Sequence, residues 1–370
     1  MDKKSSLREL AAFFGRLGFT AFGGPAAHIA LMQKEVVDRR GWMDHQHFLD
    51  LVGATNLIPG PNSTEMAIHI GYERGGWKGL LVGGACFILP AVLLTGVVAW
   101  LYQRYGHLPG VDAWVYGIKA AIIPIILAAA LALAKRAVRT VTLRIVGIIV
   151  LVACLLGLDE IYAMFGAGLV TLSLYMARNA ATRTNGFFPV LLQIPAAGMN
   201  LRIFLIFLKI GAILYGSGYV LFAFLDKELV AKGLLSRSVL MDAIAVGQFT
   251  PGPVFSSVTF IGWQLGGWQA AAWATLGVFL PSFLFVGLLN PLVPRMRRSK
   301  MFSAFLDGVN VASVAIILVV SWTFGRATVT DWKPGLITLL SALVVFGFPR
   351  LNTALVVLGG SLLGYILTII

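Results

Sequence analysis

The residues best suited to chemistry lie in one segment, residues 56 to 66, which reads NLIPGPNSTEM. Proline has no N–H group and clashes with the preceding helical turn, so Pro59 and Pro61 should interrupt a helix, while Gly60 lets the backbone turn. A new helix that starts near Asn62 would direct its free N–H groups and the positive end of its dipole at one place, where an anion could bind. The expected binding residues of this turn are Pro59, Gly60, Pro61, Asn62, Ser63 and Thr64.

Two further segments carry similar chemistry. A second Pro-Gly-Pro turn is followed by serines, and the segment FGGPAAH near the start of the chain is expected to break a helix as well. Backbone N–H groups and hydroxyl groups at such breaks could replace the water that a tetrahedral dianion loses on entering a membrane. The residues that these segments add to the expected site are Gly23, Gly24, Pro25, Pro251, Gly252, Pro253, Ser256 and Ser257.

Charged residues near these turns could neutralise an anion or carry a proton. Arg16 and Lys209 lie within apolar stretches, where an anion could use them, although a side chain that snorkels to the interface explains either one equally well. Asp50 and Asp242 lie beside the proline turns, as proton carriers or as caps of helices. Glu65 directly follows the first turn and is the stronger candidate for proton coupling.

The elements that hold these residues are expected to lie in a membrane. The chain has 370 residues, of which 58% are hydrophobic and 12% charged, and its mean hydropathy is +0.85. A soluble core could not bury so much apolar surface, so the sequence predicts an all-helical polytopic membrane protein. Basic residues gather between the apolar runs, which indicates cytoplasmic loops and no binding of nucleic acid. The basic start of the chain is expected to be retained, because no small-residue cleavage site follows it.

The sequence contains a duplicated half. The segment GGWKGLLVGGACFILP, ending at Pro90, matches GGWQAAAWATLGVFLP, ending at Pro281, and this offset of 191 residues continues to the end of the chain. Upstream the offset is 192 residues and places Asn56 on Gln248, and nearer the start it is 193 residues. Each change of offset marks one inserted or deleted residue. Two such changes still leave a match that indicates that one half is a duplicate of the other. The expected parts are a first repeat at 1–185, a linker at 186–202 and a second repeat at 203–370.

Charge predicts that the two halves point in opposite directions. Each half contains apolar stretches, and basic residues cluster after the fourth stretch in the first half but before it in the second. By the positive-inside rule this swap indicates an inverted repeat, which is typical of secondary transporters. Inversion requires an odd number of crossings, so either one stretch per half is re-entrant or the linker adds a span, and we expect about 10 to 13 transmembrane or re-entrant helices. The clusters are Lys135, Arg136, Arg139 and Arg144, and Arg295, Arg297, Arg298 and Lys300.

The ordered motifs FGGP, PGPN and GGW, with PGP and GGW repeated, resemble the chromate ion transporter (CHR) family in its long, two-domain form. The resemblance spans nearly the whole chain and rests on FFGRLGFTAFGGPAAH, LVGATNLIPGPNSTEMAIHIGYERGGWKGL, KIGAILYGSGYVL and AIAVGQFTPGPVFSSVTFIGWQLGGWQ. The segment YGSG, with Ser217 and Gly218, departs from FGGP, so the two breaks are not expected to be equivalent. The family's motif residues in this chain would be Gly23, Gly24, Pro25, Pro59, Gly60, Pro61, Asn62, Pro251, Gly252 and Pro253.

The resemblance implies a transporter, not an enzyme, that exports chromate across the bacterial inner membrane by a secondary, proton-linked mechanism and confers chromate resistance. Sulfate is also a tetrahedral dianion, so a sulfate or other oxyanion transporter is the alternative, and competition between the anions would separate the two. A membrane-embedded enzyme acting on a lipid is the distant alternative, for which the sequence shows no clustered metal ligands. Without a Walker motif, an ion gradient is the expected driving force, and no cofactor or metal is expected. The expected partners are the anion and the lipid bilayer, and a homodimer is left open.

Overall fold

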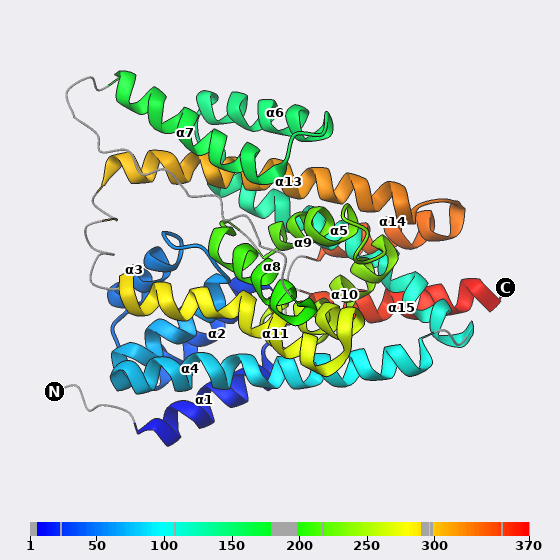
Figure 1. Cartoon of the computed structure of the whole chain (residues 1–370), viewed down its shortest axis with the longest axis horizontal. Helices are drawn as coiled ribbons and strands as arrows, with labels where there is room; N and C mark the ends of the chain where they lie inside the picture. Colours follow the sequence, from blue (N-terminus) through cyan, green and yellow to red (C-terminus); the bar gives the residue numbers. More distant parts are fainter. Residues whose placement is uncertain are drawn as a thin grey trace.

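The structure is a computed structural model of the chain, and it describes residues 6–22, 24–106, 109–178, 198–216, 218–289, 296, 299–348 and 351–369. All regular secondary structure in these residues is helical, and the two termini lie at opposite ends of the molecule (Figure 1). The all-helical membrane architecture is therefore confirmed. Gly23, Ser217 and most of the expected linker lie outside the described residues. The helices long and apolar enough to cross a membrane are Asn62–Tyr105, Asp112–Ala137, Glu160–Arg178, Val254–Leu288 and Lys300–Thr328.

The helices of the two halves correspond to each other in order. The first half consists of α1 (Leu7–Thr20), α2 (Pro25–Gln33), the π-helix η1 (Lys34–Arg39), α3 (His45–Thr55), α4 (Asn62–Tyr105), α5 (Pro109–Ala137), α6 (Val141–Leu155) and α7 (Glu160–Arg178). The second half consists of α8 (Met199–Ile213), α9 (Val220–Leu225), the π-helix η2 (Asp226–Val230), α10 (Arg237–Phe249), the short 3₁₀ turn η3 (Val254–Ser256), α11 (Ser257–Leu289), α13 (Lys300–Thr328), α14 (Trp332–Gly347) and α15 (Thr353–Ile369). Even the π-helical turn is repeated.

Residues at matching positions of the two repeats cap the starts of matching helices. Asp44 caps α3, because its side chain accepts a hydrogen bond of 2.8 Å from the N–H of His47. Ser236, which lies 192 residues later in the chain, caps α10 by accepting from the N–H of Val239 at 3.3 Å. Such caps satisfy N–H groups that have no partner within the helix, so the repeat specifies the same start in both halves.

Helices α4 and α11 each fold back on themselves at a glycine. Gly76 and Gly267, which are counterparts in the repeat, have φ values of 59° and 69°, where glycine is strongly favoured. In α4 the two arms pack so closely that a Cβ on Gly71 or Gly79 would strike the backbone of the other. We name the arms α4a (62–75), α4b (77–105), α11a (257–266) and α11b (268–289).

In the first half, the start of α1, the loop between η1 and α3, and the end of α4a lie at the same end of the molecule. Glu9, near the start of α1, lies 3.3 Å from Arg40 after η1. Arg74, near the end of α4a, donates to the carbonyl of Trp42 before α3 at 3.2 Å. Helix α1 with α2, and α3 with α4a, therefore form two re-entrant hairpins with tips at the FGGP and PGP breaks. The sequence predicted either one re-entrant stretch per half or a span in the linker, whereas the structure shows that both broken stretches of the first half turn back.

The two halves are inverted, as charge predicted. Helices α4 and α11 lie side by side (Figure 1), and their long arms are antiparallel. Trp77 at the start of α4b packs on Gly287 near the end of α11b, whereas Trp263, just before the turn of α11, donates to Gln103 near the end of α4b at 2.8 Å. The hairpins of the first half therefore open at one end of the molecule and those of the second half at the other.

The first basic cluster and Lys300 of the second lie at the end where the first-half hairpins open. Leu143 at the start of α6 packs with Val311 in the first part of α13, so the loop before α6 lies at the same end of the molecule as the start of α13. We call this the basic end, and the positive-inside rule places it at the cytoplasm. Arg295, Arg297 and Arg298 of the second cluster lie outside the described residues.

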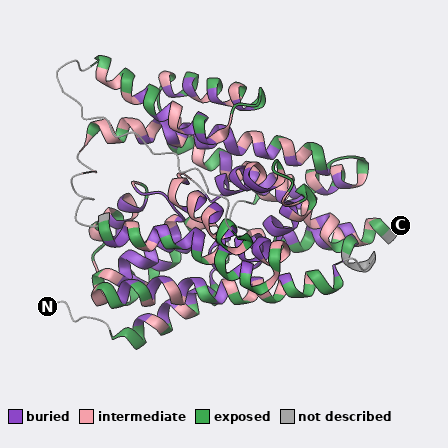
Figure 2. Cartoon of the chain, viewed as in Figure 1, coloured by how far each residue is buried: buried purple, intermediate pink, exposed green. Residues whose placement is uncertain are grey.

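The outer faces of the helices are apolar and exposed, whereas the interior is buried (Figure 2). Leu93 of α4b, Ile148 of α6 and Leu343 of α14 are among the large exposed apolar side chains. Such faces suit contact with lipid. The two proline turns are buried inside the protein, where irregular backbone is tolerated in a membrane.

Candidate anion site at the two proline turns

The first proline turn begins a helix that has no side-chain cap. Gly60 has a φ of 139°, and α4 starts at Asn62, as the sequence predicted. The N–H groups of Thr64 and Glu65 donate to the carbonyl of Pro61 at 2.8 and 3.0 Å. Within the described residues, no side chain caps this start. The N–H groups of Asn62 and Ser63, which make no hydrogen bond within the described residues, are therefore free to meet an anion.

The side chains of this turn are buried and include atoms without hydrogen-bond partners. The hydroxyl of Ser63 lies 3.3 Å from Nδ1 of His28 on α2. The hydroxyl of Thr64 and both carboxyl oxygens of Glu65 make no hydrogen bond to any described residue. Buried polar atoms are normally satisfied, so such a group marks a place for a ligand, a water or a proton.

Asn62 is half-buried at the start of α4. Its side-chain amide donates to Oδ1 of Asn56 at 2.8 Å, across the turn. This contact holds the amide beside the first N–H groups of the helix, where it can act as a further donor.

The second proline turn has similar geometry. Gly252 has a φ of 93°, and the N–H of Ser256 donates to the carbonyl of Pro253 at 2.9 Å. The hydroxyl of Ser256 accepts a hydrogen bond of 3.4 Å from Thr95, and that of Ser257 is buried without a partner in the described part of the chain. This turn therefore offers hydroxyl groups and a helix start, as the first turn does.

Each turn is bonded to the broken helix of the other half. The N–H of Gly60 donates to the carbonyl of Leu214 at the end of α8 at 2.8 Å, and the N–H of Gly252 donates to the carbonyl of Ala21 at the end of α1 at 2.8 Å. The repeat relates the two bonds, because it places Gly60 on Gly252 and Ala21 on Leu214. The two turns are therefore joined by one reciprocal contact, which no pattern in a single half could reveal.

The FGGP break lies just beyond this contact. Gly24 precedes α2 without a side-chain cap among the described residues, and Pro25 takes the first helical position. Proline suits that position because it needs no N–H partner there.

The two turns differ in the groups that surround them. A Cβ on Gly60 would strike a carboxyl oxygen of Glu65 and lie 2.6 Å from the hydroxyl of Ser282 in α11b. The hydroxyl of Ser282 lies beside the carboxyl of Glu65 but is not aligned for a hydrogen bond. In the second turn the repeat replaces Glu65 with Ser257 and Ser282 with Ala91. Only the first turn therefore holds an acid.

The basic candidates are occupied elsewhere or exposed. Lys209 lies 2.7 Å from Glu228 of η2, which also contacts Lys232. Burial raises the pKa of Glu228, but hydrogen bonds from Lys209 and Lys232 outweigh it and hold the pKa below its usual value. Arg16 is exposed on α1. The structure therefore shows neither cation at the helix starts.

The two aspartates have different surroundings. Asp242 is 2% exposed, lies 2.8 Å from Nζ of Lys119 on α5 and accepts a hydrogen bond of 2.6 Å from Tyr102. Asp50, its counterpart, is half-buried and accepts from Gln46 at 3.3 Å. The ion pair between Asp242 and Lys119 could not be predicted from the sequence, because the two residues lie far apart along the chain.

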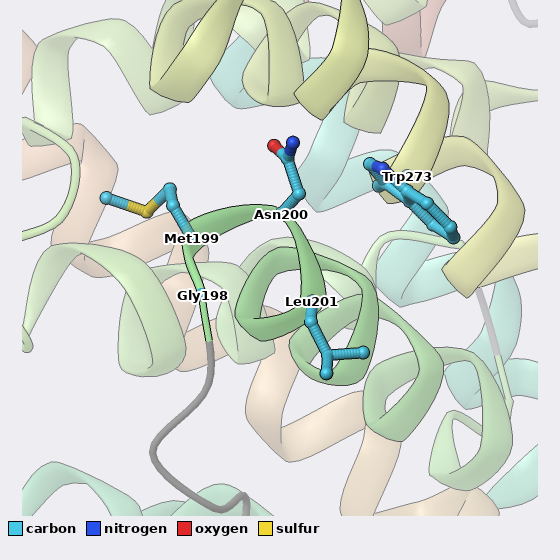
Figure 3. A pocket seen from close by; sticks show the side chains of 5 residues that line it. All are labelled: Gly198, Met199, Asn200, Leu201 and Trp273. Carbon is cyan, nitrogen blue, oxygen red and sulfur yellow. The ribbon is translucent and has the colours of Figure 1, made fainter.

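A hollow of about 450 Å³ lies at the start of α8 and is lined by Gly198, Met199, Asn200, Leu201 and Trp273 (Figure 3). Its lining contains none of the residues of the proline turns. Among the described residues, no group of three or more His, Cys, Asp or Glu side chains could hold a metal ion. The two proline turns remain the place where buried donors gather.

Ser282, His28 and His69 are not among the site residues predicted from the sequence. Their signal was a polar side chain in an apolar run at a position where the other half has none. Ser282 corresponds to Ala91, for example. Only the cross-half packing shows that such a residue reaches the first turn.

Known proteins are similar in sequence to this chain. A family model described as Chromate transporter matches residues 8–172 and again 201–365. A chromate transport protein of Cupriavidus metallidurans is 30% identical over 373 residues, which cover 98% of this chain and 93% of that protein. A chromate transport protein of Pseudomonas aeruginosa is 27% identical over 386 residues, 98% and 92% of the two chains. An uncharacterized transporter of Methanocaldococcus jannaschii is 26% identical over 396 residues, 99% and 96%. No solved structure matches the chain.

The family model matches once in each half, and its two copies start at Arg8 and Leu201. These starts are separated by the same offset that relates α1 to α8. Both copies contain a re-entrant proline turn, and both lie in one continuous chain whose full-length relatives are named transporters. The chain therefore belongs to the chromate transporter family.

Proposed function

We propose that the protein carries chromate out of the cytoplasm across the bacterial inner membrane, as a secondary transporter driven by the proton motive force. Export of this kind would lower cytoplasmic chromate and confer resistance. Family membership supports the substrate, since two of the full-length relatives are named chromate transport proteins. The observation that carries the mechanism is the pair of uncapped helix starts at the two proline turns, one from each inverted half.

The donors at the turns suit a tetrahedral dianion. Chromate loses hydration when it enters a membrane protein, and N–H groups at a helix start, together with hydroxyl groups, can replace that hydration. The first turn offers the N–H groups of α4 with Ser63 and Thr64, and the second offers Ser256. Helix dipoles supply partial positive charge, so the site works without a buried lysine or arginine.

The inverted hairpins suit alternating access. The first turn lies at the tip of a hairpin that opens at the basic end, and the second at the tip of one that opens at the opposite end. Rocking of one half against the other would expose the turns to the two sides in alternation. The reciprocal bonds from Gly60 to Leu214 and from Gly252 to Ala21 are the contacts that such a motion would remake.

Sulfate is the second candidate substrate, because N–H and hydroxyl donors do not by themselves distinguish one tetrahedral dianion from another. Chromate uptake into everted membrane vesicles with an imposed pH gradient, with and without excess sulfate, tests both possibilities. Uptake that collapses with the gradient and resists sulfate would support a selective proton-driven exporter. Uptake abolished by sulfate would support a broader oxyanion carrier, and no uptake would refute the proposal.

The anion site is tested by Asn62→Asp. The new carboxylate keeps the shape of the side chain but would repel a dianion at the helix start, so chromate uptake should fall at least about tenfold. Negative charge at a helix start stabilises the helix, so the protein should remain folded.

The matched control is Asn352→Asp at the start of α15. Asn352 Oδ1 accepts from the N–H of Ala354 at 3.0 Å, and an aspartate preserves that bond. This variant should transport as the wild type does. Normal uptake by Asn62→Asp in the same vesicles would remove the first turn from the anion site.

A further inference from the structure

We propose that Glu65, His69 and Glu73 form a proton relay along α4a, which connects the first proline turn to the basic end and has no equivalent in the second half. The inference rests on the proposed function, because it names the route of the coupling proton. In an exporter driven by the proton motive force, that proton must leave the protein on the cytoplasmic side. The relay would open on that side.

The three residues share one face of the half-helix. They follow one another at intervals of four residues, and residues at that spacing are neighbours on a helix surface. Each step advances about 6 Å along the axis. The side chains become more exposed from the first residue to the last. Glu65 is 0% exposed and His69 is 1% exposed, whereas Glu73 is exposed. The series therefore runs from the tip of the hairpin to its mouth.

The two inner members form no ion pair within the described residues, and the group beside Glu65 is the hydroxyl of Ser282. Both carboxyl oxygens of Glu65 and both ring nitrogens of His69 are buried without a hydrogen bond. Packing alone does not explain these atoms, since an apolar side chain of similar size would avoid the cost of burying them. A proton carrier must be able to bind and release a proton, and a step of about 6 Å can be bridged by one water.

The outer member reaches a second titratable group. Oε2 of Glu73 lies 3.6 Å from Nε2 of His47 on α3, and both side chains are partly exposed. A proton that arrives at the mouth of the hairpin therefore meets a carboxylate and an imidazole in contact with solvent, where either can pass it on.

The neighbouring elements supply few other titratable groups near the inner members. His28 of α2 reaches Ser63 through Nδ1, Tyr215 after α8 lies near Glu65, and α11b contributes the hydroxyl of Ser282. In the described part of the chain, no lysine or arginine forms an ion pair with Glu65. No fixed cation there would hold Glu65 permanently ionised.

The repeat shows that the relay belongs to one half. The counterpart of Glu65 on α11a is Ser257, and the segment IGYERGGW aligns with IGWQLGGW, which places His69 on Phe260 and Glu73 on Gln264. None of these three counterparts titrates near neutral pH. Anion donors occur at both turns, whereas groups that could carry a proton along the hairpin occur only at the first. The proton and the anion would therefore use different parts of the molecule.

The experiment uses purified protein in liposomes and two assays. Exchange of chromate for chromate without a gradient reports binding and the conformational change, and transport driven by an imposed pH gradient reports coupling. His69→Asn should keep exchange within about twofold and lose gradient-driven transport by about 100-fold, a typical effect of removing a positioned proton carrier. Glu65→Gln should lose the gradient response to the same degree. His69→Glu, which can again carry a proton, should recover part of it.

The matched control is Glu160→Gln in α7, which removes another partly buried carboxyl with an unpartnered oxygen away from the turns. It should behave as the wild type does. A normal gradient response in both His69→Asn and Glu65→Gln would overturn the relay. Wild-type exchange without any gradient response would also overturn it while leaving chromate transport intact, whereas no chromate movement at all would refute the proposed function itself.

Discussion

Gly60 occupies a position in the first turn that no larger residue fits. Its φ of 139° lies in a region that side chains disfavour, and a Cβ would fall on the carboxyl of Glu65 and near the hydroxyl of Ser282. Its N–H is also the group that bonds to Leu214. One residue therefore sets the turn, leaves room for the acid and joins the two halves.

A substitution at Gly60 should therefore reduce both the stability of the protein and its transport activity. Gly60→Ala should lower the free energy of unfolding by about 1–3 kcal/mol, as for a strained backbone position, and should abolish chromate uptake. Thermal unfolding in detergent and vesicle transport are the measurements. As the control, a Cβ on Gly15 in α1 meets no atom within 4 Å, so Gly15→Ala should be neutral or stabilise by up to about 1 kcal/mol. Equal effects of the two substitutions would contradict this account.

Single residues also show where sequence reasoning stops. The helix start at Asn62 was predicted correctly, because proline sterics act over a few residues. The sequence could not predict that Lys209 pairs with Glu228 or that Asp242 pairs with Lys119, because only folding brings these residues together. A charged residue in an apolar run indicates that it has a partner in the folded protein, but it does not indicate which residue that partner is.

Among the elements, the broken helices hold the turns of the proposed anion site. Helix α1 has 14 residues, about 21 Å, whereas the hydrocarbon of a bilayer is about 30 Å thick. Hydropathy located the apolar stretches and proline located their breaks. Whether the chain then continues across or turns back depends on contacts such as Arg40 with Glu9 and Arg74 with Trp42, and these are tertiary.

The π-helical turn η2 is tied to α8 by an ion pair with a testable pH dependence. Because the folded-state pKa of Glu228 lies below its usual value, the pair stabilises the fold above the usual glutamate pKa, and this contribution is lost as pH falls through the lowered value. Glu228→Gln should reduce the free energy of unfolding at pH 7 by about 1–2 kcal/mol, and the difference should vanish in acid.

Thermal unfolding across pH is the measurement for Glu228→Gln. Glu9→Gln is the control, since the pair of Glu9 with Arg40 is largely exposed and should contribute less than about 1 kcal/mol. A difference between Glu228→Gln and the wild type that persists at low pH would mean that the side chain stabilises the turn through packing instead of charge.

At the scale of the whole molecule, the proposed alternating access depends on the inversion of the two halves. Lys78 and Gln269 are counterparts just after the turns of α4 and α11, and both are exposed. In a chain without Cys86 and Cys154, Lys78→Cys should react with an impermeant thiol reagent from the cytoplasmic side and Gln269→Cys from the opposite side. Labelling of both positions from one side would disprove the inverted arrangement.

The sequence by itself determined the features that depend on local chemistry or on comparison of one stretch with another. These are the helical membrane class, the duplicated half, the positions of the proline breaks and, through the charge swap, the inversion. Only the tertiary structure decided that two stretches per half turn back, that each proline turn bonds to the other half, and that Glu65 meets Ser282. Sterics and periodicity act within a few residues, whereas these contacts join residues far apart in the chain, and the packing of one half on the other selects them.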